Sequence, residues 1–215
     1  IPEGILFFAL PAWLAMNGKD ATEIAAFIGI ILIPWSFKLL IAPLMDRFTI
    51  LSMGRKRPWV IFGQLGLIIS FLSIGFVPDP LNNNLGLMTV GFMISFFGAF
   101  QDVATDGMAV DVIPDNEKAR ANGLMWGTKI IGTSLSLLVG TALINSLGFT
   151  SAISLLSIAV AIIMIVPIYF TERPGEKTMP WTKGEANSES KESQLRSWLD
   201  ILKSLGRVAR LKSSL

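Results

Sequence analysis

Long apolar stretches alternate with short polar ones along most of this 215-residue chain. Six stretches are almost continuously apolar: about 1–16, 24–45, 59–77, 86–112, 119–144 and 149–170. A helix needs about 20 mostly apolar residues to cross the hydrocarbon core of a bilayer, which is about 30 Å thick. The pattern therefore predicts an all-α membrane protein with six transmembrane helices. A soluble helical protein is disfavoured, because a chain of this length could not cover six such helices.

Lysine and arginine occupy alternate connections between these stretches. Four lie in 46–58, one lies in 113–118 and nine lie from 171 onwards, whereas the other connections hold only Lys19. Cytoplasmic loops of membrane proteins are enriched in these two residue types. We therefore expect a multi-pass membrane protein with its N-terminus and 171–215 in the cytoplasm. We further expect the membrane to be a bacterial inner membrane, which the charge pattern by itself does not specify. Because the chain opens inside an apolar stretch without a methionine, we expect the first helix to be truncated.

The composition limits the chemistry of the chain. Hydrophobic residues make up 52% of it and charged residues 16%, compared with about 25% charged in soluble domains. It contains no cysteine and no histidine, which excludes disulfides, thiolate or imidazole metal ligands and a histidine base within it. Proton chemistry would therefore fall to carboxylates and lysines. We expect a lipid bilayer as surroundings and no metal, cofactor or nucleic-acid partner.

The fourth apolar stretch ends with three aspartates in the sequence QDVATDGMAVD. At about 1.5 Å per residue, Asp102 lies about 15 Å and Asp106 about 9 Å from the predicted helix end near Val112. Both share one helix face with small residues such as Ser95, whereas Asp111 points away and marks the interface. A charge inside the membrane costs about 3 kcal/mol or more, so these carboxylates need a reason to be there.

Two lysines inside predicted helices lie at matching depths. Lys129 is about ten residues from the predicted start of the fifth helix, which matches the depth of Asp102, and Lys38 lies near the depth of Asp106. We therefore predict the pairs Asp102–Lys129 and Asp106–Lys38. Glu3 adds a third acid, in the first helix. Two interpretations stay open: these groups carry protons and bind a solute, or they are ion pairs that fix helix packing.

The candidate site residues fall into two sets inside the membrane. The proton-coupling candidates are Asp102, Asp106 and Glu3. The substrate-cavity candidates, which include polar residues on the same helix faces, are Lys38, Lys129, Gln101, Asn122, Thr133 and Ser136. Gln64, in the third helix, is interpreted as a hydrogen-bonding contact between helices.

An acid at the end of the second helix is followed by a basic cluster before the third. We expect Asp46 to accept hydrogen bonds from Arg55, Arg57 or backbone amides, and so to hold one conformation closed. Membrane topology alone would also explain the cations. The candidate cytoplasmic gating loop consists of Asp46, Arg47, Gly54, Arg55, Lys56 and Arg57.

This loop resembles the signature loop between the second and third spans of the major facilitator superfamily. The match lies at Leu44, Asp46, Arg47, Gly54, Arg55 and Lys56, whereas Ala42 departs from the pattern and 49–53 are additional. The loop is joined by LPAWL, PWSFKLLIAPLMDR, GRKRPW and QDVATDG. These stretches are similar to one branch of the superfamily, the muropeptide permeases and acetyl-coenzyme A transporters. The resemblance covers about 1–175.

The resemblance implies a twelve-helix transporter of which this chain forms the N-terminal six-helix half. It implies alternating access, with the first, second, fourth and fifth spans around a cavity, and a C-terminal six-helix half as partner. Such transporters often carry an arginine in the fourth span. Gln101, Asp102 and Asp106 occupy that region here, so coupling schemes based on arginine are not carried over.

Three parts of the chain are expected. They are a transmembrane bundle (1–170), a cytoplasmic polar linker (171–194) and a cytoplasmic amphipathic helix of the central loop (195–215), which could equally be an ordinary connecting helix. The leading functional hypothesis is a proton-driven secondary transporter of a polar organic solute, and not an enzyme. The alternatives are a non-transporting membrane receptor or scaffold, and a membrane-embedded transferase.

Overall fold

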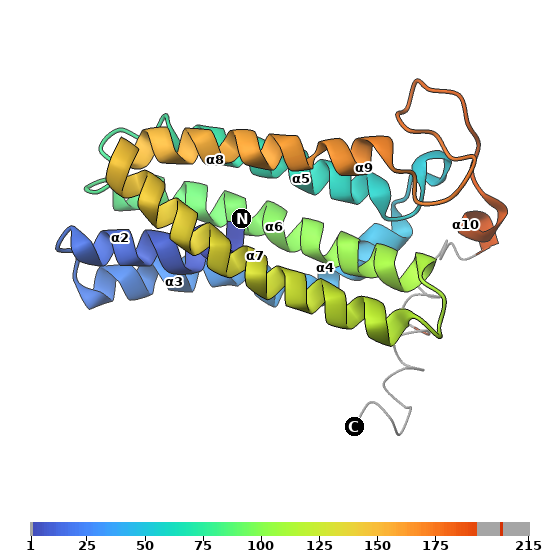
Figure 1. Cartoon of the computed structure of the whole chain (residues 1–215), viewed down its shortest axis with the longest axis horizontal. Helices are drawn as coiled ribbons and strands as arrows, with labels where there is room; N and C mark the ends of the chain where they lie inside the picture. Colours follow the sequence, from blue (N-terminus) through green and yellow to red (C-terminus); the bar gives the residue numbers. More distant parts are fainter. Residues whose placement is uncertain (1, 193–202, 204–215) are drawn as a thin grey trace.

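The computed structural model describes residues 2–192 and 203, which form helices and connecting loops (Figure 1). The first rod consists of α1 (Pro2–Gly4), the π-helical η1 (Ile5–Ala9) and α2 (Leu10–Met16). The later elements are α3 (Ala21–Ser36), α4 (Lys38–Arg47), η2 (Leu51–Met53), α5 (Arg57–Ile74), α6 (Asn84–Val112), α7 (Lys118–Leu147), α8 (Phe149–Ile163), α9 (Ile165–Tyr169) and α10 (Ser188–Glu192). The predicted amphipathic helix of 195–215 lies outside the described residues, except at Lys203.

Five helical segments in the described part of the chain are long and apolar enough to cross a membrane. They are Ala21–Arg47, Arg57–Ile74, Asn84–Val112, Lys118–Leu147 and Phe149–Tyr169. The segment Pro2–Met16 is apolar but shorter. These segments coincide closely with the six apolar stretches of the sequence and confirm the predicted all-α membrane architecture.

The connections lie at two opposite ends of the bundle (Figure 1). The α2–α3, α5–α6 and α7–α8 connections share one end. The other end, which we call the basic end, holds the α4–α5 loop, the α6–α7 turn and the segment 170–192. The alternation that the lysines and arginines showed along the sequence is therefore an arrangement in space as well.

Helix α6 is the centre of the bundle, packed between α3 and α5, while α8 packs on α5 and α7. Close approach of α5 to α6 depends on two glycines. A Cβ on Gly66 would lie 2.1 Å from the ring of Phe97, and one on Gly63 would lie 3.0 Å from Gln101. An apolar core with Phe27, Phe71, Ile94 and Ile153 as fully or nearly fully buried members fills the half of the bundle away from the basic end.

The second span is interrupted at Phe37, between α3 and α4. Pro34 has no amide hydrogen to donate, and the amide of Phe37 bonds to the Pro34 carbonyl, three residues back, in place of the one four residues back. The break lies between Trp35 and Lys38, and the Lys38 ammonium is 4.4 Å from the centroid of the Trp35 ring. It therefore redirects a charged side chain at the depth where the candidate site is formed.

Candidate functional site

A cavity of about 690 Å³ lies between the helices at the level of the predicted acids. Side chains from α1, α3, α5, α6, α7 and α8 line it. Its polar lining comes chiefly from Glu3, Gln64, Gln101, Asp102, Asp106 and Lys129, and its aromatic lining from Trp35 and Trp126. Four of the five charged candidates predicted inside the membrane therefore line one space, whereas the predicted cavity residue Lys38 is not among its lining residues.

Asp102 of α6 joins two lysines that come from different helices. Its Oδ1 accepts a hydrogen bond from Nζ of Lys129 in α7 at 2.8 Å, and its Oδ2 accepts one from Nζ of Lys38 in α4. The same Lys129 nitrogen lies 2.9 Å from Oε1 of Glu3 in α1. We call these four residues the cavity network. It contains two cations and two anions, and it links α1, α4, α6 and α7.

The predicted pair Asp102–Lys129 is present, whereas Lys38 binds Asp102 and not Asp106. The prediction for Lys38 treated the second helix as continuous, and the break at Phe37 changes the direction in which Lys38 leaves the backbone. Asp106 makes no hydrogen bond or ion pair with any described residue. Its side chain is exposed to the cavity. Counted together, the five charged groups have three carboxylates and two ammonium groups, which is one more negative charge than positive.

Tryptophan rings form the wall beside the lysines. The Lys38 ammonium lies 4.4 Å and the Lys129 ammonium 5.6 Å from the centroid of the Trp35 ring. Lys129 is also 5.2 Å from the centroid of Trp126. Trp35 is fixed in turn, because its Nε1 donates to Oγ of Ser95 at 2.7 Å. The rings attract the cations through their negative faces and shield one side of them from water.

The other predicted cavity residues divide into three groups. Thr133 and Gln101 line the cavity, whereas Asn122 lines a second hollow of about 440 Å³ that shares Asp106 with the first. Ser136 is not among the lining residues of either hollow, because a Cβ on Gly4 would lie 2.7 Å from its Cβ. The small residues on this part of α7 thus serve close packing with α1.

Gln64 makes the contact between helices that the sequence indicated. Its Nε2 donates to the carbonyl of Val160 in α8 at 2.7 Å, and its Oε1 accepts from Nε2 of Gln101 in α6. One buried amide therefore ties α5, α6 and α8 together along the wall of the cavity.

A second set of charges lies at the basic end. Oδ1 of Asp46 accepts hydrogen bonds from Nζ of Lys56 at 2.6 Å and from Nη2 of Arg55 at 3.1 Å. Nη1 of Arg55 lies 3.2 Å from Oδ2 of Asp111, so this arginine connects the ends of α4 and α6. The stem of Lys56 crosses α6 at Gly107, where a Cβ would lie 3.0 Å from Cε of the lysine.

Arg57 has a different role from the one the sequence indicated, because it forms no ion pair with Asp46. Its guanidinium donates to five backbone carbonyls: Pro167 at 2.7 Å, Ile168 at 2.7 Å, Lys177 at 2.8 Å, Thr178 at 2.6 Å and Met53 at 3.4 Å. It is 1% exposed. Arg57 thereby joins the end of α9 to the returning chain, and we call this arrangement the carbonyl clamp.

Two glutamates after α9 complete this region, and sequence reasoning did not select them. Oε2 of Glu172 accepts the backbone N–H groups of Lys56 and Arg57 at 2.9 and 3.1 Å, at the start of α5. Glu176 is also buried and accepts from the amide of Arg173 at 3.0 Å and from Oγ of Ser190 at 3.0 Å. The available signal was a pair of acids directly after the last apolar stretch, facing a loop with four cations.

Gly54 sits at the point where these parts meet. Its φ is +105°, and a Cβ there would lie 2.5 Å from Oε2 of Glu172. Within residues 2–192 and 203, no group of three or more acids is arranged to hold a metal ion. The arrangement can order charged and polar solute groups in the cavity, and it can hold helix ends together at the basic end.

Comparisons with known proteins point to one family. The family model described as Major Facilitator Superfamily matches residues 1–210. The chain is 28% identical over 143 residues to the anhydromuropeptide permease of Escherichia coli (strain K12), which covers 66% of this chain and 28% of that protein. It is 26% identical over 141 residues to the putative transporter AmpG 3 of Rickettsia prowazekii, covering 64% and 32%. It is 32% identical over 122 residues to an uncharacterized protein of Haemophilus influenzae, covering 57% and 28%. The aligned part therefore spans about a third or less of these relatives.

Proposed function

The chain belongs to the major facilitator superfamily, in the branch of the muropeptide permeases, and we propose that it forms part of a proton-coupled secondary transporter. The protein moves a polar organic solute by alternating access across a bacterial inner membrane. The observation that carries this proposal is the cavity network, four charged groups from four helices beside a hollow of about 690 Å³. An anhydromuropeptide is the first solute to test, because a relative is named for it.

Paired charges beside a hollow favour transport over a purely structural role. Each charge in the membrane costs about 3 kcal/mol or more when it is neither paired nor hydrated, so either role requires a partner or water. Packing alone would be served by closed ion pairs with no space beside them. Here the side chains of Lys38 and Lys129 are each 32% exposed, and Asp106 faces the same space without a partner among the described residues.

Among the three candidate carboxylates, Asp106 is the best placed to carry the coupled proton. Both oxygens of Asp102 are bonded to lysines, and Glu3 is paired with Lys129, so a proton would have to displace a cation from either. Asp106 can take up or release a proton without breaking an ion pair. Lys38 and Lys129 then orient anionic or carbonyl groups of the solute when their own partners rearrange.

The charges at the basic end form the gate. Asp46, Arg55 and Asp111 hold α4 against α6, with Lys56 laid across Gly107 between them. Their separation would accompany one of the two access states. The remaining part of the transporter would supply the other wall of the cavity, since the aligned part spans about a third or less of the relatives.

Proteoliposomes with an imposed pH gradient test this function. The wild-type protein should accumulate an anhydromuropeptide, and the recovered solute should be chemically unchanged, as expected for a transporter and not an enzyme. Asp106→Asn should abolish accumulation driven by the gradient while exchange of solute without a gradient continues. Asp115→Asn is the matched control, because that side chain is 95% exposed in the α6–α7 turn. Undiminished accumulation in Asp106→Asn would remove this carboxylate from the coupling mechanism.

A further inference from the structure

The chain turns back towards the membrane after the sixth span. Nη2 of Arg57 donates to the carbonyls of Ile168 and Thr178, so these two oxygens lie no more than about 5 Å apart. Nε and Nη1 of the same guanidinium bind Pro167 and Lys177. The chain at 177–178 therefore runs beside 167–168 in the last turn of the span, ten residues further along the sequence.

This return fixes the depth of the turn that follows. Ile168 belongs to the final turn of the membrane-spanning segment Phe149–Tyr169, so the Thr178 carbonyl lies within about 5 Å of the level of that turn. Trp181 is three residues further on and can lie at most about 10 Å from Thr178. The polar headgroup region on each side of a bilayer is about 5–7 Å thick, so the turn is within reach of it.

The turn presents an aromatic side chain in a fixed geometry. The amide of Met179 donates to Oγ1 of Thr182 at 3.0 Å, and the Thr182 hydroxyl donates back to the carbonyl of Met179 at 2.9 Å. Trp181 lies between Met179 and Thr182 in the sequence, and its side chain is 81% exposed. Tyr169 and Phe170, at the end of the span, are also mostly exposed. Tryptophan and tyrosine gather at membrane interfaces because one part of the ring system is apolar and another forms hydrogen bonds.

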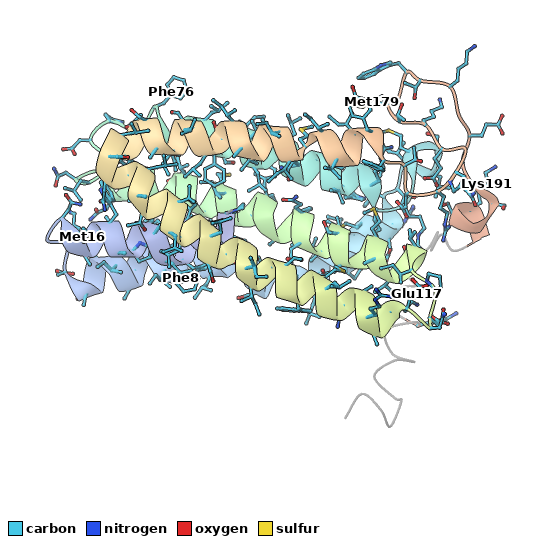
Figure 2. All side chains as sticks on the ribbon, in the orientation of Figure 1. Phe8, Met16, Phe76, Glu117, Met179 and Lys191 are labelled. Atoms are coloured by element: carbon cyan, nitrogen blue, oxygen red, sulfur yellow. The ribbon has the colours of Figure 1, made fainter. Side chains whose placement is uncertain are left out.

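The turn lies on a side of the helix bundle that can face lipid. Figure 2 shows Met179 beside α9, on the side of the bundle opposite to Glu117 of the α6–α7 turn. The exposed cation Lys183 follows the tryptophan by two residues, and cations at this position suit the phosphates of lipid headgroups.

We propose that 178–183 is an interfacial lipid anchor, in which Trp181 enters the phospholipid headgroup region at the basic end and Arg57 is the buried clamp that holds the anchor at that depth. The occupant is the phospholipid interface of the bilayer that the helices already span. The anchor ties the chain after the sixth span to the membrane surface, so the loop moves with this span. It does not depend on the solute or on proton coupling.

A fluorescent reporter beside Trp181 tests the anchor. The chain has no cysteine, so Lys183→Cys provides its single labelling site for an environment-sensitive fluorophore in the intact protein. The protein is placed in phosphatidylcholine nanodiscs that contain a spin-labelled phosphatidylcholine as quencher. Lys191→Cys in α10 is the matched control, since it is exposed at the same end of the molecule. Quenching at 183 should exceed that at 191 by at least about threefold.

Two further variants, made in the Lys183→Cys background, separate the anchor from general proximity to lipid. Trp181→Ala should reduce lipid quenching towards the value of the 191 control. Arg57→Lys should do the same, because an ammonium cannot reproduce the fork that binds five carbonyls. Helicity measured by circular dichroism verifies that both variants are folded.

Three outcomes would overturn the proposal. Preferential quenching of the 183 label by iodide would place the turn in water. Resistance to both lipid and iodide quenchers would mean that protein covers it. Unchanged lipid quenching in both Trp181→Ala and Arg57→Lys would show that neither the anchor nor the clamp sets the depth of the turn.

Discussion

The cavity network and the carbonyl clamp differ in the partners that their charges use. In the cavity network, charged side chains bind charged side chains, and each contact can be exchanged by a change of rotamer. In the carbonyl clamp, Arg57 binds backbone carbonyls, which cannot leave without moving the chain. The exposed fraction differs as well, with 32% for the side chain of Lys129 and 1% for Arg57.

This difference in partners distinguishes charges that can exchange partners during transport from charges that hold the structure together. Ion pairs beside water can break and re-form during a transport cycle, because water or a solute can replace each partner. A guanidinium sealed among carbonyls has no such replacement, so its release would leave buried acceptors without donors. The type of partner, together with access to water, is therefore more informative about role than the presence of a charge in a membrane protein.

The sharpest way to break this comparison is to remove the clamp. Arg57→Met keeps much of the volume but removes every hydrogen bond of the guanidinium. Hydrogen bonds from charged groups contribute about 1.5–3 kcal/mol each and are not additive, so we expect a loss of at least about 4 kcal/mol in the free energy of unfolding. Chemical unfolding in detergent measures it, with exposed Arg120→Met as the control. A loss below about 1 kcal/mol would contradict the structural role assigned to Arg57.

Removing the centre of the cavity network should affect transport more than stability. Asp102→Asn leaves Lys38 and Lys129 without a shared carboxylate while the hollow still admits water. We expect solute accumulation to fall about 100-fold, which corresponds to about 2.7 kcal/mol, with a change in unfolding free energy smaller than that of Arg57→Met. Uptake per folded protein in proteoliposomes measures this, with Asp115→Asn as control. Uptake within about twofold of wild type would make the network a packing element.

The sequence was sufficient to predict the helices and part of the network. The length of each apolar stretch was enough to locate the spans. The depth of each charged residue, calculated for straight helices, was enough to pair Asp102 with Lys129. The same arithmetic failed for Lys38, because the break at Phe37 cannot be read from residue spacing. It also failed for Ser136, since a small polar residue serves close helix packing as readily as a cavity wall.

The region after the sixth span was less predictable for a different reason. Its composition is typical of a polar linker, yet Glu172 and Glu176 are buried there. Their burial depends on donors that lie more than a hundred residues earlier for Glu172 and on Ser190 for Glu176. Such contacts between distant segments leave no periodic signal. They are found only once the fold places the α4–α5 loop beside the end of α9.

A change at Gly54 sharpens the comparison without removing a charge. Gly54→Ala places a methyl group 2.5 Å from Oε2 of Glu172, at a φ of +105° that other residues adopt only with strain. We expect a loss of about 2 kcal/mol in the free energy of unfolding, through displacement of Glu172 from the start of α5. Gly29→Ala, inside α3 with no atom near the added methyl, should be neutral or stabilising. Equal effects of the two substitutions would contradict this explanation.

The smallest expected effect is a pH dependence of stability that is confined to the region of the carbonyl clamp. Burial raises the pKa of Glu176 above its ordinary value and nearby Glu172 raises it further, while the Arg173 amide and the Ser190 hydroxyl oppose the rise. Two cations, Arg173 and Arg57, also face this carboxylate. A raised pKa in the folded state means that the protonated form fits the site best. The contribution of Glu176 is therefore fully present below the ordinary glutamate pKa of about 4.3 and is lost as the pH rises through the raised value.

A spin label at Lys191→Cys reports whether α10 stays docked against Glu176, because Ser190 bonds to that carboxylate. Its mobile fraction should increase from pH 4 upwards, because the cost of burying the ionised carboxylate outweighs the stronger hydrogen bond that it accepts from Ser190. Glu176→Gln keeps the shape of the side chain and cannot ionise, so its label should show no such increase. Solute exchange through the cavity should not follow this titration, since Glu176 lines neither hollow. A pH response of equal size in Glu176→Gln, or one of opposite sign in the wild type, would assign the titration to another group. It would also remove the proposed difference between a pH-sensitive clamp and a cavity that functions independently of it.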